Sequence, residues 1–114
     1  MITAECDNPT VDKILEALAP GDTLQCLYKT YLEPIIEYDK YCGTDYLDFI
    51  FSYLQYDGHI KTISEKMFLH RNTVHYRIKK IEELLGCDLS KLDTKMYLLL
   101  AASAYAHAKE AQQA

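Results

Sequence analysis

GHIKTISEKMFLHRNTVHYRIKKIEELLG, residues 58–86, carries the strongest structural signal in this chain. Its apolar residues recur at helical spacing in two runs with a very short connection between them, which predicts two helices joined by a tight turn. This pattern is typical of a helix-turn-helix, whose second helix enters the major groove of DNA, although an ordinary helical hairpin shares some of its features. The residues expected to form the core of this unit are Ile63, Ser64, Met67, Leu69, Val74, Ile78 and Ile81.

The outward face of the second predicted helix, about Arg71 to Leu85, is polar and cationic. At ~100° per residue, the apolar positions of this helix fall within roughly 40° of Val74, and the polar ones gather on the other side. Arginine and lysine donate to guanine, and asparagine bonds adenine in bidentate fashion. Hydroxyls and helix N-terminal amides bond phosphate oxygens. The DNA contacts are therefore predicted to be Lys61, His70, Arg71, Asn72, Thr73, His75, Tyr76, Arg77, Lys79 and Lys80.

The net charge of −5 conceals a basic segment. Residues 59–81 hold six cations and one acid, a net charge of +5, whereas the rest of the chain holds six cations and sixteen acids. Concentrated charge of one sign attracts an oppositely charged polymer whatever the total is. A solvated amphipathic helix is the simpler interpretation. It does not explain why all four cations between Arg71 and Lys80 precede Glu82 and Glu83. The other candidate function is a helical protein-interaction or dimerisation module whose basic face meets an acidic protein.

Helical periodicity also dominates the rest of the chain, so an all-α fold is expected. Asn8 is predicted to cap a first helix that carries Val11, Ile14, Leu15 and Leu18 on one face, and a second begins at Asp22. Pro34 is expected to interrupt that second helix, with a loop over residues 39–43. Thr44 is then expected to cap a helix that ends before Gly58.

Two predicted helices are more apolar than a single buried face requires: the one after Thr44 and the last one, about Asp93 to Lys109. We interpret their extra apolar surface as a dimer or interdomain contact, with a plain core as the alternative. A dimer would read two half-sites about one turn of DNA apart, ~34 Å.

Several classes of function have little support. The chain has no apolar run of the ~20 residues that a membrane span needs and no signal peptide, so a cytoplasmic protein is expected. The four cysteines (Cys6, Cys26, Cys42, Cys87) form no Cys-x-x-Cys pair, which favours reduced, structural thiols. His70 and His75 lack the spacing of a zinc site. No nucleophile elbow or phosphate-binding glycine loop is present. We predict no catalytic residue, cofactor or metal, and surface positions for His59 and His107.

The run from His70 to Gly86 resembles the C-terminal helix-turn-helix of the PucR/CdaR regulators of purine catabolism and sugar diacids. The segment 31–39, YLEPIIEYD, and the residues after Gly86 fit the same family, so the likeness covers about residues 30–107. The arrangement is similar to the DNA-binding end of the factor for inversion stimulation. This resemblance implies a small Fis-like helical domain that binds double-stranded DNA as a dimer.

The chain is expected to divide into a peripheral helical segment (1–29), a DNA-binding domain of the PucR type (30–109, with the helix-turn-helix at about 60–85) and a tail (110–114). Two positions depart from common patterns: Ser64 stands where the family usually has alanine, and Phe68 replaces the glycine of other helix-turn-helix turns. Family members usually carry long sensory regions upstream, which 114 residues cannot hold. A fragment or a minimal member of the family is therefore expected, and the sequence does not identify a small-molecule effector.

Overall fold

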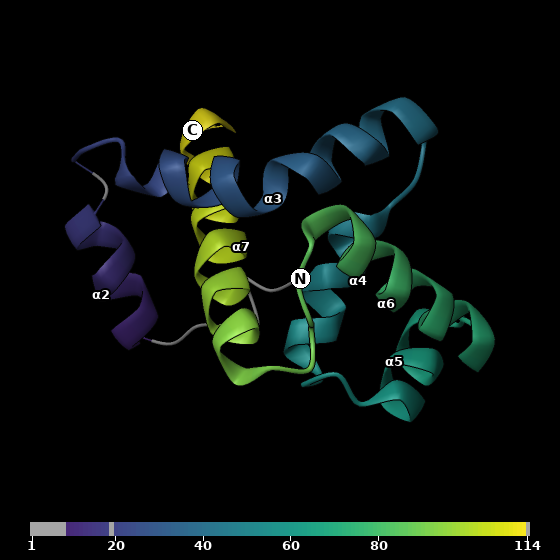
Figure 1. The fold of residues 1–114 in the computed structure, drawn as a ribbon. Helices are drawn as coiled ribbons and strands as arrows, with labels where there is room; N and C mark the ends of the chain where they lie inside the picture. Colours follow the sequence, from purple (N-terminus) through teal and green to yellow (C-terminus); the bar gives the residue numbers. More distant parts are fainter. Residues whose placement is uncertain (1–8, 19, 114) are drawn as a thin grey trace.

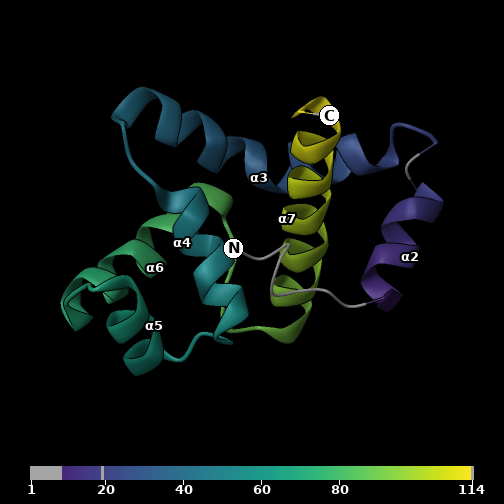
Figure 2. The ribbon, with the colours of Figure 1, turned by 180° about the vertical axis from the view of Figure 1, so that it is seen from behind.

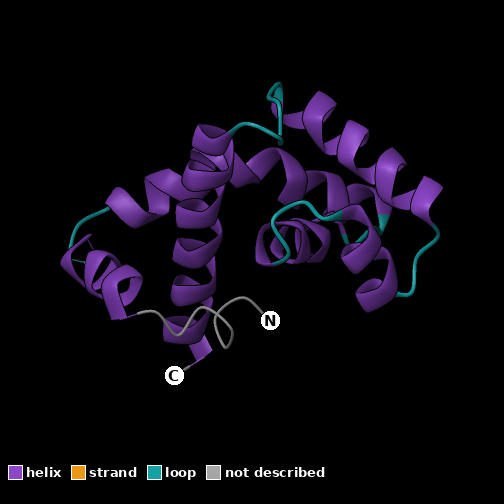
Figure 3. Cartoon of the chain, turned by 90° about the horizontal axis from the view of Figure 1, so that it is seen from below, coloured by secondary structure: helices purple, strands orange, loops and turns teal. Residues whose placement is uncertain are grey.

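The computed structural model describes residues 9–18 and 20–113, and within these ranges six helices and no strands occur (Figures 1 and 3). The all-α prediction is therefore confirmed. The helices are α2 (Pro9–Leu18), α3 (Thr23–Cys42), α4 (Tyr46–Gln55), α5 (Ile60–Met67), α6 (Arg71–Leu85) and α7 (Leu92–Gln113). Cys6 and the predicted Asn8 cap lie outside the described residues.

The long helices α3 and α7 form the frame that holds the other elements. The first half of α3 lies across α7, and α2 packs against both of these helices. The second half of α3 extends over α4 and α6 (Figure 1). Seen from behind, α4 lies between α7 and the α5–α6 pair (Figure 2). This arrangement places α5 and α6 at the end of the molecule away from α2, where α6 packs on α3, α4 and α5.

One hydrophobic core joins α3, α4, α5, α6 and α7. Tyr53 crosses it and donates a hydrogen bond to the carbonyl oxygen of Leu89 (3.2 Å). The same ring lies against Gly58, where an added Cβ would stand only 2.8 Å from the Tyr53 hydroxyl, so a side chain at this left-handed position (φ 71°) would collide with the core. The largest fully buried side chains are Leu32, Ile35, Phe49, Ile50, Ile63, Val74, Ile81, Leu89 and Leu98.

A smaller cluster attaches α2 to the frame. Leu15, Leu24 and Ala104 are buried together, with Leu18 half-buried beside them. Ile14 of the predicted stripe is instead 43% exposed, and the side chain of Val11 is not among those described. The predicted division of the chain falls inside α3, at residues 29 and 30, and inside α7, at residue 109; this division stays a prediction.

The expected break at Pro34 is wrong, because α3 continues through it to Cys42. A proline within a helix removes one backbone hydrogen bond and strains the preceding turn. Here Leu32 and Ile35, both fully buried, hold the helix to the core on either side of Pro34. Helical structure therefore replaces most of the expected 39–43 loop, and α3 ends at Gly43 in the left-handed conformation (φ 65°).

Thr44 was expected to cap α4, and the structure assigns that role to Asp39 instead. The two Asp39 carboxylate oxygens accept hydrogen bonds from the backbone amides of Tyr46 and Leu47, each at 2.9 Å, and the Thr44 hydroxyl donates to the same carboxylate. These amides are among the four that a helix start leaves without a partner in its own helix. A side chain near the end of α3 thus fixes where α4 begins.

Candidate nucleic-acid interface

Each helix of the predicted helix-turn-helix begins at a histidine that caps it. The His59 Nδ1 accepts a hydrogen bond from the Thr62 amide (3.4 Å) at the start of α5, and the His70 Nδ1 accepts one from the Asn72 amide (3.0 Å) at the start of α6. An Nδ1 that accepts leaves the ring proton on Nε2 in the neutral imidazole. Because both side chains are exposed, each presents an N–H donor beside a helix N-terminus.

The turn between α5 and α6 is closed at Phe68 and Leu69. Phe68 takes the left-handed conformation (φ 56°) and its side chain is 93% exposed, whereas Leu69 packs against the core. Of the residues predicted to form the core of this unit, Ile63, Val74 and Ile81 are fully buried, and Met67 and Ile78 pack against the same cluster. Ser64 is half-buried and hydrogen-bonds to Leu69.

The outward face of α6 is open to solvent over its first two and a half turns. Arg71, Asn72, His75 and Lys79 are exposed, and Tyr76 is 62% exposed, whereas Thr73 is half-buried. Val74 and Ile81 on the opposite side have no exposed surface. Hydrogen-bond donors, acceptors and cations therefore form a convex ridge backed by a rigid apolar contact.

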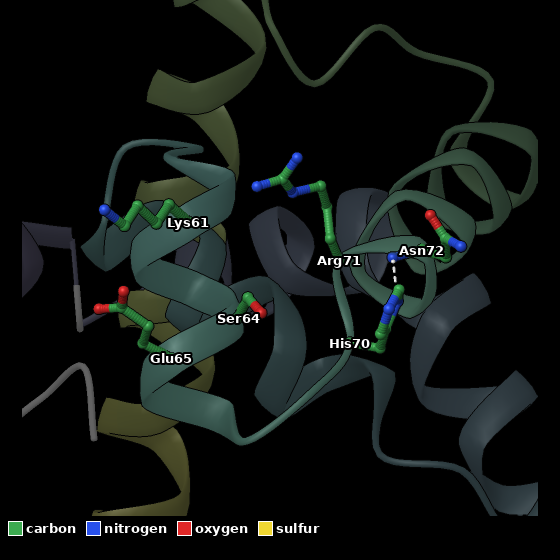
Figure 4. Close-up of a pocket in the computed structure, with 6 residues that line it drawn as sticks. All are labelled: Lys61, Ser64, Glu65, His70, Arg71 and Asn72. Atoms are coloured by element: carbon green, nitrogen blue, oxygen red, sulfur yellow. Dashed lines mark hydrogen bonds between the residues drawn. The ribbon is translucent and has the colours of Figure 1, made fainter.

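A concave site of about 490 Å³ lies between α5 and the start of α6 (Figure 4). Arg71 extends into the space between the two helices, and His70, which caps α6, lies below it (Figure 4). Lys61, Ser64 and Glu65 form the α5 side of the site, and Asn72 completes its rim. Two cations and one acid therefore surround a groove beside the start of α6.

Two of the predicted contacts are engaged within the chain. The Arg77 guanidinium donates to the Asp45 carboxylate (2.9 Å), and its side chain is only 19% exposed. The Lys80 Nζ lies 5.4 Å from the centre of the Tyr38 ring and 4.0 Å from the Glu83 carboxylate. The contact role of both cations stays a prediction.

Residues 46–104 match the family described as the PucR C-terminal helix-turn-helix domain; this range covers α4, α5, α6 and the first part of α7, and it contains the whole ridge. The chain belongs to this family. The chain therefore contains a helix-turn-helix domain of the PucR type. No solved structure matches the chain significantly.

The chain is similar to several bacterial regulators. The chain is 34% identical over 84 residues to the purine catabolism regulatory protein of Bacillus subtilis. This matched segment is 74% of this chain and 16% of that protein. It is 37% identical over 62 residues to the proline-responsive transcriptional activator PutR of the same species (54% and 15%). It is 45% identical over 38 residues to the carbohydrate diacid regulator of Escherichia coli (33% and 10%). The chain thus spans at most about a sixth of the length of these relatives.

Sequence reasoning missed the residues outside α5 and α6 that organise this PucR-type domain. Asp45 and Tyr38 hold cations of α6, and Asp39 starts the helix on which α6 packs. Their charges and rings are visible in the sequence, but no local spacing signals that they meet α6, because Asp45 and Arg77 are 32 residues apart. His59 was expected only to lie on the surface and also caps α5.

Across residues 9–18 and 20–113, no group of three or more His, Cys, Asp or Glu side chains is placed to hold a metal ion. In the same ranges, none of the helices combines the length and apolar character of a membrane span. The predicted absence of cofactors and catalytic residues stays a prediction.

Proposed function

We propose that α6 lies in the major groove of double-stranded DNA, and that the exposed ridge from Arg71 to Lys79 makes the contacts. The observation that carries this proposal is the contrast between the two sides of α6: Asn72, His75, Tyr76 and Lys79 face solvent, whereas Val74 and Ile81 are fully buried. Asn72 and Tyr76 are the proposed base-reading residues, and Lys61, His70, Arg71 and Lys79 the proposed phosphate contacts. The chain acts by binding rather than by catalysis, and in the cytoplasm, where a bacterial chromosome lies.

The experiment is the salt dependence of affinity for duplex DNA. Counterion release predicts that log K falls linearly with log salt, with a slope of about −0.9 for each phosphate neutralised. Lys79→Ala is expected to weaken all sequences alike and to make the slope shallower by roughly one unit. Lys91→Ala is the matched control, because Lys91 is an exposed lysine beyond α6. A flat salt response would favour the protein-interaction module instead.

Sequence reading is tested separately, by selection of duplexes from a random pool. Replacing Asn72 or Tyr76 by alanine is expected to relax the preference at defined base positions, each correct contact contributing about 1–3 kcal/mol of discrimination. The phosphate contacts are expected to hold the protein at the same position on the duplex, so the preferences at the other base positions stay intact. An unchanged consensus from both variants would remove the base-reading role.

We also propose a homodimer. The apolar faces of α4 are covered within one chain by α3, α6 and α7, which favours the plain-core alternative for that helix. Helix α7 differs, since Leu92 is 81% exposed and Met96 59% exposed, one turn apart. Replacing both by serine is expected to make the chain sediment as a monomer. The DNA footprint, expected for the wild type to span two half-sites with centres ~34 Å apart, should then shrink to a single half-site. A wild-type chain that sediments as a monomer and protects a single site would contradict the dimer.

A further inference from the structure

Arg77 is a cation of α6 whose charge is turned inward. Its guanidinium donates to Asp45, at the start of α4, over 2.9 Å, and lies 5.5 Å from the ring centre of Tyr46 and 5.8 Å from that of Phe49. Its side chain is 19% exposed. The other cations of the ridge, Arg71 and Lys79, are exposed. Arg77 is therefore held by one ion pair and two aromatic contacts at the start of α4, although the Asp45 side chain is itself 59% exposed.

A cation held in this way makes a poor phosphate ligand. To reach DNA, the Arg77 guanidinium would have to leave a carboxylate for another anion and also give up its contacts with two aromatic faces. The exchange replaces one charged hydrogen bond by another and gains little. Lys79 needs no such exchange, because it already faces solvent.

The Arg77 contacts have a directional character that the apolar contacts of α6 lack. Val74 and Ile81 bury apolar surface, and that attraction has no preferred direction, so it defines the rotation of α6 about its axis less sharply than a directional contact does. A charged hydrogen bond and a guanidinium against two rings define both distance and direction. Because side chains are spaced ~100° apart around a helix, a rotation of α6 would redirect Asn72 and Tyr76 together.

We propose that Arg77 and Asp45 are positioning residues: their ion pair sets the rotation of α6 relative to α4 and so aims Asn72 and Tyr76 at the bases. This inference rests on the proposed function of α6. It replaces the phosphate-contact role that the sequence pattern suggested for Arg77. Asp45 then favours specific binding even though it is an acid close to the DNA-binding helix.

The test uses the full chain, the duplex that the wild type selects from a random pool, and a scrambled duplex of equal length. Asp45→Ala is expected to lower affinity for the selected duplex by about tenfold, with the scrambled duplex and the salt slope unchanged. Arg77→Met is expected to do the same, and the double variant to lose no more than either single one. Asp48→Ala is the matched control, because Asp48 is an exposed acid in the first turn of the same helix.

A phosphate-ligand role predicts the opposite pattern. Asp45→Ala would then free Arg77 and remove a negative charge, so affinity for both duplexes would rise, and Arg77→Met would make the salt slope shallower by about 0.9. Either result would overturn the inference. Residual dipolar couplings of the α6 amides relative to α4, measured without DNA, are expected to change in Asp45→Ala and to stay the same in Asp48→Ala. Unchanged couplings would also overturn it.

The two proposals fail in different ways. A wild type that selects no duplex contradicts the DNA-binding function, and the positioning role in sequence reading falls with it. A wild type that selects a duplex while Asp45→Ala binds it as well as before contradicts the positioning role alone. Arg77→Lys serves if Arg77→Met does not fold: it keeps the ion pair but not the planar group, so an intermediate loss of specific affinity is expected. If Arg77→Lys binds the selected duplex as tightly as the wild type does, positioning by the guanidinium is contradicted.

Discussion

Ser64 and Leu69 hydrogen-bond to each other twice across the turn that joins α5 to α6. The Leu69 amide donates to the Ser64 carbonyl oxygen (3.0 Å), and the Ser64 hydroxyl donates to the Leu69 carbonyl oxygen. The second bond satisfies a backbone acceptor at a corner where the chain reverses within three residues. The angle between the two helices of the helix-turn-helix therefore depends in part on one hydroxyl.

Replacing Ser64 by alanine is expected to lower the free energy of unfolding by about 1 kcal/mol. The Leu69 carbonyl would lose its side-chain donor in a half-buried site, and this loss exceeds the small gain in helix propensity. Urea denaturation measures the change. A midpoint equal to or above that of the wild type would show that water replaces the hydroxyl without cost.

Asp39→Ala is expected to destabilise the chain by about 1–2 kcal/mol, because two backbone amides at the start of α4 lose a charged acceptor. Asp48→Ala controls for the general effect of an acid near a helix N-terminus, which contributes only about 0.3–1 kcal/mol. Asp48 lies in the first turn of α4 and is exposed. Thermal unfolding followed by circular dichroism compares the two, and equal losses would contradict the capping role of Asp39.

Phe68→Gly is expected to raise the free energy of unfolding by about 1 kcal/mol. A residue with a Cβ is strained at the left-handed φ of 56°, and glycine is not. The ring is 93% exposed, so its removal loses little buried surface. Tyr41→Gly gives the contrast: Tyr41 is 84% exposed but lies in α3, where glycine is expected to cost about 1 kcal/mol. Chemical denaturation of both variants checks the opposite signs, and a loss at position 68 would refute the strain argument.

Cys87 is expected to be the slowest of the described thiols to react with iodoacetamide. Burial raises the pKa of its thiol, so less thiolate is present at pH 8, and the rate should increase as the pH rises further. Cys26 and Cys42 are exposed. Mass spectrometry of peptides from a Cys6→Ser variant gives the three rates, and equal rates in the folded chain would contradict the prediction. Unfolding in urea is expected to remove the difference.

Local sequence was sufficient for the helix-turn-helix. Val74, Ile78 and Ile81 recur at the spacing of a helix, and the connection to Ile63 and Met67 is too short for anything but a tight turn, so the inner faces of α5 and α6 follow from periodicity alone. The buried positions of Ile63, Val74 and Ile81 confirm this. The exposed positions of Arg71, Asn72, Tyr76 and Lys79 follow from the same spacing.

The contacts between distant segments could not be read in that way. Pro34 and Thr44 carry local preferences that predict a break and a cap, and both are overridden: buried leucine and isoleucine hold α3 together, and Asp39 caps α4. Arg77 has the sequence signature of a phosphate contact, yet Asp45 and two aromatic rings hold it against α4. Local preferences amount to about 1 kcal/mol or less for most residues and about 3 kcal/mol for a proline inside a helix, so packing between elements far apart in the chain can decide where the two disagree. Periodicity establishes which residues α6 turns outward, and its contacts with α3 and α4 decide which of its cations are engaged within the chain.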